Sequence, residues 1–418
     1  MKGFIIIMNT IKKYLFNNIE YICIFFLLFL YFPDSFFGLS FYGKIRVLIC
    51  LILISLCLLK YSENKIKSVV LKSIITSPEL KLISLIEIPY IFIWLYTFLR
   101  TIFGLSIQNQ FYKASTMLLS ISCSLVLVLM ILLVFKKKSI KVFLLSAVLN
   151  YSVVILKALY DIGITGILNF RELNETWVYR GLEVHELTFI LGLFAVFCII
   201  YMNKIKWFKY CIPILLLFVY LGYKRITFLA IAISLICIFL LNNNKIKTFV
   251  PWFIIITSFL YLISSAFGQQ VFTMISDLFH INFMGRIDIY HYFSKQLSFG
   301  SFLFGHGFMF SESYMALSPV YKFYDALHND IYRIFIDGGI IYFLFILYYL
   351  VFGIKKVIFK YIGTIDYKVY LVILIYTFIH FLTDNLIIYP RFIMIIVFLI
   401  SYQVLYMNKK EVSSNNAK

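Results

Sequence analysis

Residues 114–135, ASTMLLSISCSLVLVLMILLVF, contain no charged side chain and are followed by three consecutive lysines. A helix needs about 20 mostly apolar residues to cross the hydrocarbon core of a bilayer. Backbone groups inside lipid have no water to bind, so they must pair within the segment, as they do in an α-helix. The stretch therefore predicts a transmembrane helix that ends at a basic membrane surface.

The same pattern recurs along the whole chain. Of its 418 residues, 62% are hydrophobic and only 14% are charged, and the mean hydropathy is +0.94. A soluble protein could not bury so much apolar surface, and the short alternating segments of a β-barrel are missing. We therefore predict an all-α polytopic membrane protein. About twelve spans are expected, at 19–37, 45–60, 80–103, 114–135, 140–160, 186–202, 208–222, 225–241, 248–266, 330–353, 368–388 and 390–407.

The connections between these spans alternate in charge, which predicts the orientation. Cytoplasmic loops are enriched in basic residues, so the lysine-rich connections and both termini are expected in the cytoplasm. The net charge of +19 is mostly this orientation signal, and no nucleic-acid partner is expected. The connections that carry lysine and no arginine are 1–18, 60–81, 136–141, 203–209, 242–248, 354–368 and 408–418.

Every arginine falls on the outer side under this topology. Arginine is permanently charged and binds phosphate or carboxylate through two parallel hydrogen bonds. Arg225, Arg286 and Arg391 lie at or near helix ends that face the outer compartment, so they are candidates for holding an anionic group. Pairing with nearby carboxylates, or a place among the lipid headgroups, accounts for Arg46, Arg100 and Arg171.

One long polar interruption divides the chain into residues 1–265, a large outer loop at 266–329, and residues 330–418. The side chains of 286–297 repeat at helical spacing, which predicts a short helix lying along the membrane surface. Gly305-His306-Gly307 in the same loop favours a tight turn. The seven cysteines all lie in apolar runs, so packing is a better explanation for them than a disulfide framework.

His328, at the exit of the loop, is the candidate catalytic residue. A histidine titrates near neutrality, so it can take a proton from a sugar hydroxyl or orient that hydroxyl. Asn329 follows directly, and Tyr332 lies one turn further, where it can share a face with His328. A histidine at a membrane border can equally bind a neighbouring aspartate, and the residue types alone leave both roles open. The spacing of the histidines does not suggest a zinc site, and no phosphate-binding loop or nucleophile elbow is present.

Taken in order, these motifs resemble the O-antigen polymerase and ligase family of bacterial polysaccharide assembly. The likeness covers roughly residues 180–345. It departs at Lys224, where the family has a small residue, and at Tyr342, where a second glycine is common. Its motifs are Tyr223-Lys224-Arg225, Gly285-Arg286-Ile287, Gly305-His306-Gly307-Phe308, Leu327-His328-Asn329-Asp330 with Gly339, and the weaker Arg180-Gly181 before His185-Glu186.

This resemblance implies a glycosyltransferase of the GT-C type in the bacterial cytoplasmic membrane, with its active site facing the periplasm or exterior. The substrate would be an undecaprenyl-diphosphate-linked oligosaccharide, with no nucleotide sugar, metal or other cofactor required. Arg225 and Arg286 would bind the diphosphate, with Arg391 and Arg180 as further candidates and Asn329 and Tyr332 near the substrate. His328 would activate or orient the acceptor hydroxyl, and attack opposite the diphosphate would invert the anomeric configuration.

The leading hypothesis is a polymerase of O-antigen or capsule, for which a chain-length regulator and a flippase are conceivable partners. One alternative is a ligase that moves the finished glycan to another acceptor. A second is a transporter or flippase of lipid-linked oligosaccharide. A transporter should carry ionisable residues deep in its spans. The predicted spans are nearly free of them, with Glu87 and Lys157 as the clearest exceptions, which favours an enzyme with a site at the surface.

Overall fold

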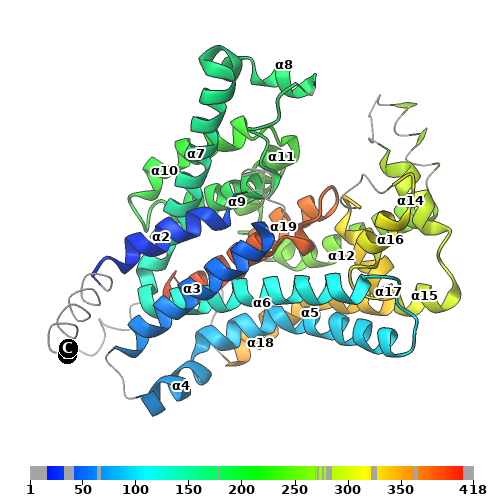
Figure 1. Cartoon of the computed structure of the whole chain (residues 1–418), viewed down its shortest axis with the longest axis horizontal. Coiled ribbons are helices and arrows are strands. Elements are labelled where there is room, and N and C mark those ends of the chain that lie inside the picture. The colour runs from blue at the N-terminus through cyan, green and yellow to red at the C-terminus, as the bar shows by residue number, and fades with distance from the viewer. Residues whose placement is uncertain are drawn as a thin grey trace. The chain divides into compact units, whose positions relative to one another are not determined.

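The computed structural model describes residues 17–32, 42–63, 67–176, 178–268, 270, 273–274, 277–278, 285–321, 327–361 and 366–407. Every regular element in these ranges is helical, and the predicted all-α polytopic membrane fold is confirmed (Figure 1). Six segments are long and apolar enough to cross a membrane. They contain α3 (Tyr42–Ser62), α5 (Pro78–Ile102), α6 (Gln110–Phe135) with α7 (Ser139–Leu168), α12 (Asn244–Phe267), α17 (Asp330–Tyr348) and α20 (Pro390–Tyr402).

Shorter apolar helices account for the remaining predicted spans. They are α2 (Ile19–Leu30), α9 (His185–Tyr201), α10 (Phe208–Leu221), α11 (Arg225–Leu240) and α19 (Tyr367–Phe381). Each of the twelve predicted spans overlaps one of these long or short helices. The orientation of the helices in a membrane stays a prediction.

Some helical segments lie in regions that were predicted as connections. Helix α4 (Lys67–Ile75) lies in a connection that was expected to be cytoplasmic. Helix α7 continues eight residues past the predicted end at 160, through a kink at Gly163, and α8 (Phe170–Glu175) follows it. Most of residues 161–175, which follow the predicted span 140–160, are therefore helical, although Gly163 has a non-helical φ of +67°.

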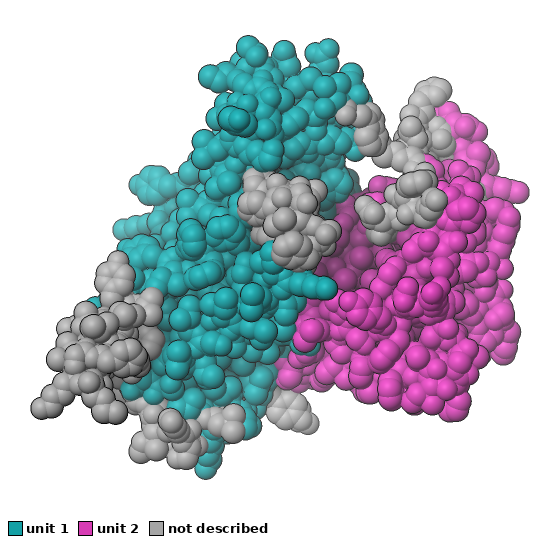
Figure 2. All heavy atoms as spheres, in the orientation of Figure 1, with its two compact units in different colours: residues 1–83, 122–231, 394–418 teal, residues 84–121, 232–393 magenta. Residues whose placement is uncertain are grey.

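The chain forms two compact units, which Figure 2 shows in different colours. Unit 1 comprises 1–83, 122–231 and 394–418, and unit 2 comprises 84–121 and 232–393. In unit 1, α9 packs against α7 and α10. Nearly every side chain of α9 is buried, as expected for a helix that is apolar all round. The division into 1–265, 266–329 and 330–418 follows topology and stays a prediction.

Helix α17 organises unit 2. It contacts α12 and two short helices of the large loop, α15 (Phe299–Phe304) and α16 (Phe310–Leu317). Helix α14 (Arg286–Ser294) packs against α12 in the same unit. The helix predicted over 286–297 is thus present, and it ends three residues early. After α17 the chain continues through a π-helical turn at Tyr349–Gly353 into α18 (Ile354–Tyr361).

Candidate functional site

The His-Asn motif forms the start of α17, where Asn329 is the N-cap. Its side-chain oxygen accepts a hydrogen bond from the Tyr332 N–H at 2.9 Å. Its amide nitrogen donates to Ser265 Oγ of α12 at 3.0 Å. Asparagine is among the best N-cap residues because its oxygen satisfies an otherwise unpaired helix N–H. Both ends of this buried side chain therefore fix the start of α17 against α12.

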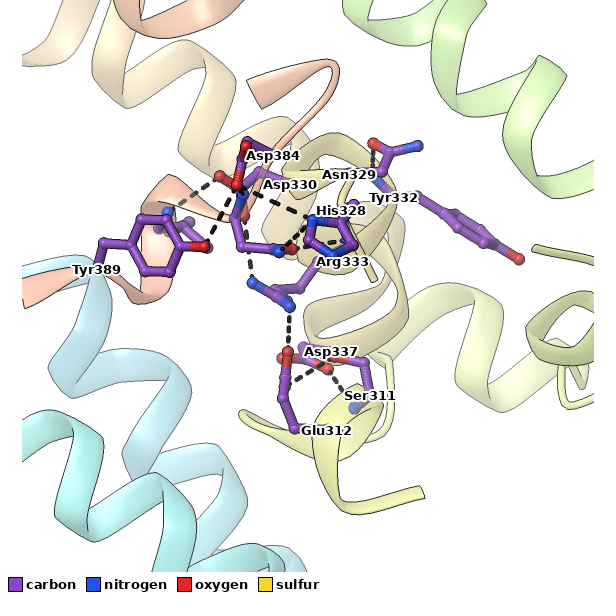
Figure 3. A network of polar contacts seen from close by, with 12 residues as sticks. Ser311, Glu312, His328, Asn329, Asp330, Tyr332, Arg333, Asp337, Asp384 and Tyr389 are labelled. Carbon is purple, nitrogen blue, oxygen red and sulfur yellow. Dashed lines mark hydrogen bonds and ion pairs between the residues drawn. The ribbon is translucent and has the colours of Figure 1, made fainter. Parts of the chain in front are cut away.

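His328 precedes the cap with φ +53°, a left-handed conformation that is uncommon outside glycine. Its position is fixed by the segment between α19 and α20, as Figure 3 shows. The His328 N–H donates to Asn385 Oδ1 at 2.8 Å, and Asn385 Nδ2 lies 3.0 Å from His328 Nδ1. Asp384 Oδ1 lies 4.0 Å from the same ring nitrogen. The His328 side chain nevertheless keeps 31% of its surface exposed, so a ligand can reach it.

This pair of contacts selects one tautomer of His328. A backbone N–H can only donate, so the Asn385 amide oxygen must face it. The amide nitrogen then faces Nδ1 and donates to it, which makes Nδ1 an acceptor. A neutral imidazole carries one hydrogen, which is therefore on Nε2. In this arrangement His328 presents a hydrogen-bond donor at Nε2, which suits it to orient an oxygen of a ligand.

A buried ion-pair network lies close to His328, around the first turn of α17. The Arg333 guanidinium, 1% exposed, pairs with Glu312 of α16 and with Asp330 Oδ1 at 3.4 Å. Asp330 Oδ2 also accepts from the Ile387 N–H at 3.0 Å, in the segment that positions His328. Buried charges of this kind require partners, since an unpaired one carries a large desolvation cost. The network joins α16, α17 and the 384–388 segment (Figure 3).

These residues correct one sequence interpretation. The predicted spans were described as nearly free of ionisable side chains, yet Asp330, Arg333 and Asp337 are all buried in α17. Their spacing of three and then four residues places them on one helix face, a signal that the sequence offered and that we did not use. Within the described residues they contact each other, Glu312 and nearby backbone groups. Their presence weakens the argument that spans nearly free of ionisable residues favour an enzyme over a transporter.

The Gly-His-Gly motif is a tight turn packed against α17, as predicted. The His306 and Gly307 N–H groups donate to the carbonyl oxygens of Ile336 and Asp337, at 2.9 and 2.7 Å. A Cβ on Gly305 would lie 2.4 Å from the Asp337 carbonyl oxygen and the Gly339 nitrogen. Both Gly305 and Gly339 have positive φ, +72° and +70°. Only glycine fits this close approach of two backbones.

His306 itself is half-buried in this turn. Its ring stacks on Phe310 with centroids 4.1 Å apart. Burial, together with the nearby Arg100 charge, lowers the pKa of His306 to about 4. Arg100 donates to the carbonyl oxygens of Gly305 and Leu105 at 3.3 and 2.9 Å, and has no carboxylate partner in the described part of the chain. Carboxylate pairing, one of the two roles predicted for Arg100, is therefore not found among the described residues, and its hydrogen bonds stabilise the turn.

Arg286 begins α14 and is linked to the His328 motif through Tyr290. The Tyr290 side chain hydrogen-bonds that of Asn329, and its carbonyl oxygen accepts from the Tyr332 hydroxyl at 3.3 Å. Burial raises the pKa of Tyr290, and the positive charge of Arg286 opposes this shift. The structure thus brings Arg286 and His328 into one connected region of unit 2.

Tyr332 and Arg391 also belong to unit 2. Tyr332 is fully buried and points away from His328 in Figure 3, so the two side chains do not share a face as predicted. Its hydroxyl instead supports the backbone of α14. Arg391 is half-buried in the first turn of α20, just after Tyr389, whose hydroxyl donates to Asp384 at 3.3 Å. Direct substrate contacts by Asn329, Tyr332 and Arg391 stay predictions.

Arg225 and Arg180 lie in unit 1. Arg225 is the first residue of α11 and its side chain is 82% exposed. Arg180 Nε lies 3.9 Å from Glu183, which also binds Lys224 at 2.7 Å and His185 at 3.1 Å. Burial of Glu183 opposes ionisation, but the His185 hydrogen bond and the Lys224 charge outweigh it and lower the pKa of Glu183 to about 2. Lys224, a departure from the family pattern, is therefore accounted for by this pairing.

The sequence analysis missed Asp384 and Asn385, which hold His328. They lie 56 and 57 residues beyond it, and no local motif connects the two segments. The sequence analysis also missed Glu312, the partner of Arg333. Within the described residues, no group of three or more His, Cys, Asp and Glu side chains is placed to hold a metal ion.

Residues 210–347 match the family model described as O-Antigen ligase, a segment that covers about a third of the chain. The match contains Arg225, Arg286, His328, Asn329 and Tyr332, and extends from α10 nearly to the end of α17. Searches among curated proteins and among solved structures gave no match.

Proposed function

Because the chain belongs to the O-antigen polymerase and ligase family, we propose that it is a polymerase of a bacterial surface polysaccharide such as O-antigen or capsule. It would transfer the growing glycan from undecaprenyl diphosphate onto a newly supplied lipid-linked repeat unit, as a GT-C glycosyltransferase. The reaction would take place on the outer face of the cytoplasmic membrane, with both termini in the cytoplasm. A flippase would supply the substrate and a chain-length regulator would limit the product.

The observation that carries this proposal is the position of His328. It is partly exposed, its backbone and ring are both held by Asn385, and it adjoins the Asn329–Tyr290 contact that leads to Arg286. A histidine held this firmly at an accessible point is suited to contact a reacting hydroxyl, because catalytic groups must be oriented before the substrate arrives.

In the proposed reaction, an oxygen of the acceptor glycan attacks the anomeric carbon of the donor. The bond from that carbon to the diphosphate breaks, and its electron pair leaves with the diphosphate oxygen. Attack from the opposite side inverts the configuration. Arg286 and Arg225 are the proposed cations that stabilise the diphosphate, with Arg391 and Arg180 as further candidates. The proton of the acceptor hydroxyl leaves as the new bond forms and ends on the released diphosphate or in solvent. In the tautomer that Asn385 selects, His328 orients the acceptor through Nε2–H; it could take up the hydroxyl proton at Nε2 only if the Asn385 amide turned over.

Alanine substitutions of His328 and Arg286 test the proposal. His328→Ala and Arg286→Ala should each abolish long-chain polysaccharide in cells, while the amount of protein in the membrane stays the same. Matched controls are His291→Ala and Lys295→Ala, which remove an exposed histidine and an exposed cation from α14 and the turn after it. Normal chain lengths in both test variants would refute the assignment of these residues to the active site.

A ligase is the second candidate, because the matching family model is described as O-Antigen ligase. The two activities differ in the acceptor. The purified full chain, given only a lipid-linked repeat unit, should produce a ladder of chain lengths if it is a polymerase. A ligase would produce no ladder from that substrate and would need a second, chemically different acceptor.

A further inference from the structure

Unit 1 contains a pocket of about 340 Å³ between α8, α10 and α11. Its size lies at the lower end of the range for small-molecule sites. Two guanidinium groups, one carboxylate and three aromatic rings line it. These belong to Arg171, Glu175, Tyr220, Tyr223, Arg225 and Phe228.

For Arg171, the sequence indicated only pairing with a carboxylate or a place among the lipid headgroups. Its guanidinium lies over the Tyr220 ring, 4.9 Å from the ring centroid. It forms no ion pair with any carboxylate in the part of the chain that the structure describes, so its predicted acidic partner is not found there. A guanidinium stacked on a ring keeps the N–H groups at its edge available, which is the edge that binds an oxyanion.

Arg225 occupies the same pocket in a similar way. Its guanidinium lies 5.6 Å from the Tyr223 ring centroid, and its Nη2 is 3.5 Å from Glu175 Oε1. This contact is long for a charged hydrogen bond and uses one oxygen only. The same oxygen accepts a hydrogen bond from the Tyr223 hydroxyl. Glu175 therefore orients Tyr223 and Arg225 without neutralising both arginines.

The aromatic part of the pocket is held in place from behind. Phe170, which is buried, makes edge contacts with Tyr220 and Tyr223, with ring centroids 5.7 and 6.0 Å apart. Such contacts fix the rings on which the two arginines stack. The guanidinium groups are thus partly ordered before a ligand binds, which lowers the entropy lost on binding.

We propose that this pocket binds a phosphate group of a lipid, with Arg171 as its second cation beside Arg225. The pocket has two positive charges and one negative charge, so it favours an anion. A tetrahedral phosphate can accept hydrogen bonds from two guanidinium groups on separate helices, whereas one arginine already satisfies a planar carboxylate. The proposal shares with the proposed function only the anion-binding role of Arg225. The phosphate could belong to the lipid-linked substrate or to a membrane phospholipid.

Binding to the full chain in nanodiscs of neutral phosphatidylcholine tests this, with farnesyl diphosphate as the probe and farnesol as the uncharged control. Arg171→Gln should weaken farnesyl diphosphate binding about tenfold. Arg171→Lys should weaken it less, because lysine keeps the positive charge but cannot form the two parallel hydrogen bonds of a guanidinium group. Glu175→Gln should tighten binding about threefold, since it removes the competing charge. Lys141→Gln, near the start of α7, removes the same charge elsewhere in unit 1 and should have no effect.

Unchanged affinity in Arg171→Gln, or equal losses for farnesyl diphosphate and farnesol, would overturn the proposal. Nanodiscs that contain phosphatidylglycerol identify the source of the phosphate. Competition with the probe would indicate a phospholipid headgroup, and no competition would indicate the lipid carrier; either result supports a phosphate site. The assay involves no glycan transfer, so a protein that binds the probe but makes no polysaccharide would refute the proposed function and leave this inference standing.

Discussion

Arg333 in unit 2 and Arg225 in unit 1 show two opposite uses of the same side chain near the start of a helix. Arg333 is 1% exposed and pairs with Glu312 and Asp330. Arg225 is 82% exposed and has one long contact with Glu175. A buried arginine must be matched by carboxylates, whereas an exposed one keeps most of its donors for a ligand. We infer that the first maintains the geometry around His328 and that the second is available for binding.

The largest effect should follow from breaking the buried pair. Arg333→Gln leaves Glu312 and Asp330 buried without their cation, which should lower the free energy of unfolding by about 3–5 kcal/mol. Arg225→Gln, the exposed counterpart, should change it by less than about 1 kcal/mol. Thermal unfolding of the two purified variants in detergent, followed by size-exclusion fluorescence, measures the difference. Equal melting temperatures would show that the Arg333 network does not stabilise unit 2.

The same contrast explains what the sequence could and could not predict. Apolar runs located all twelve predicted helices, because the lipid environment forces long apolar segments to be helical. The start of α17 was also predictable, since Asn329 is a local cap. The burial of Arg333 depends on Glu312 and on α16, and the position of His328 depends on Asn385. Such contacts between distant segments leave no periodicity in a single sequence. Sequence reasoning therefore favoured Arg225, at a helix end. The spacing of Asp330, Arg333 and Asp337 indicates one polar helix face, but it does not indicate that Glu312 of α16 pairs with Arg333.

Two glycines allow the same comparison between a packed position and an open one. Gly305 and Gly104 both have positive φ, +72° and +67°. A Cβ at Gly305 would collide with backbone atoms of α17, while one at Gly104 would meet nothing within 4 Å. Gly104→Ala should cost about 1–2 kcal/mol of stability, the conformational term alone. Gly305→Ala should cost about 3 kcal/mol or more, because the turn must also move away from α17.

Thermal unfolding of the two glycine variants measures these costs directly. Gly305→Ala should also reduce polysaccharide synthesis, because Asp337 accepts hydrogen bonds from Met309 and Ser311, just beyond the turn, and displacing the turn would disturb α17 below His328. If both variants lost the same stability, the packing of the turn on α17 would contribute nothing measurable.

The smallest expected effect concerns Asn385, a positioning residue that acts through His328. In Asn385→Asp, one carboxylate oxygen can still accept a hydrogen bond from the His328 N–H. The other oxygen, which replaces the amide nitrogen beside Nδ1, cannot donate a hydrogen bond to that nitrogen and can only accept one. Nδ1 must then carry the hydrogen, so Nε2 changes from donor to acceptor. If His328 orients its ligand through Nε2–H, the rate of chain extension at neutral pH should fall about tenfold, roughly 1.4 kcal/mol. The added negative charge also favours the imidazolium form of His328, so the midpoint of the pH–activity profile should shift to higher pH.

An unchanged or faster rate in Asn385→Asp would instead identify His328 as the base that removes the hydroxyl proton, because the variant presents the lone pair that this step needs.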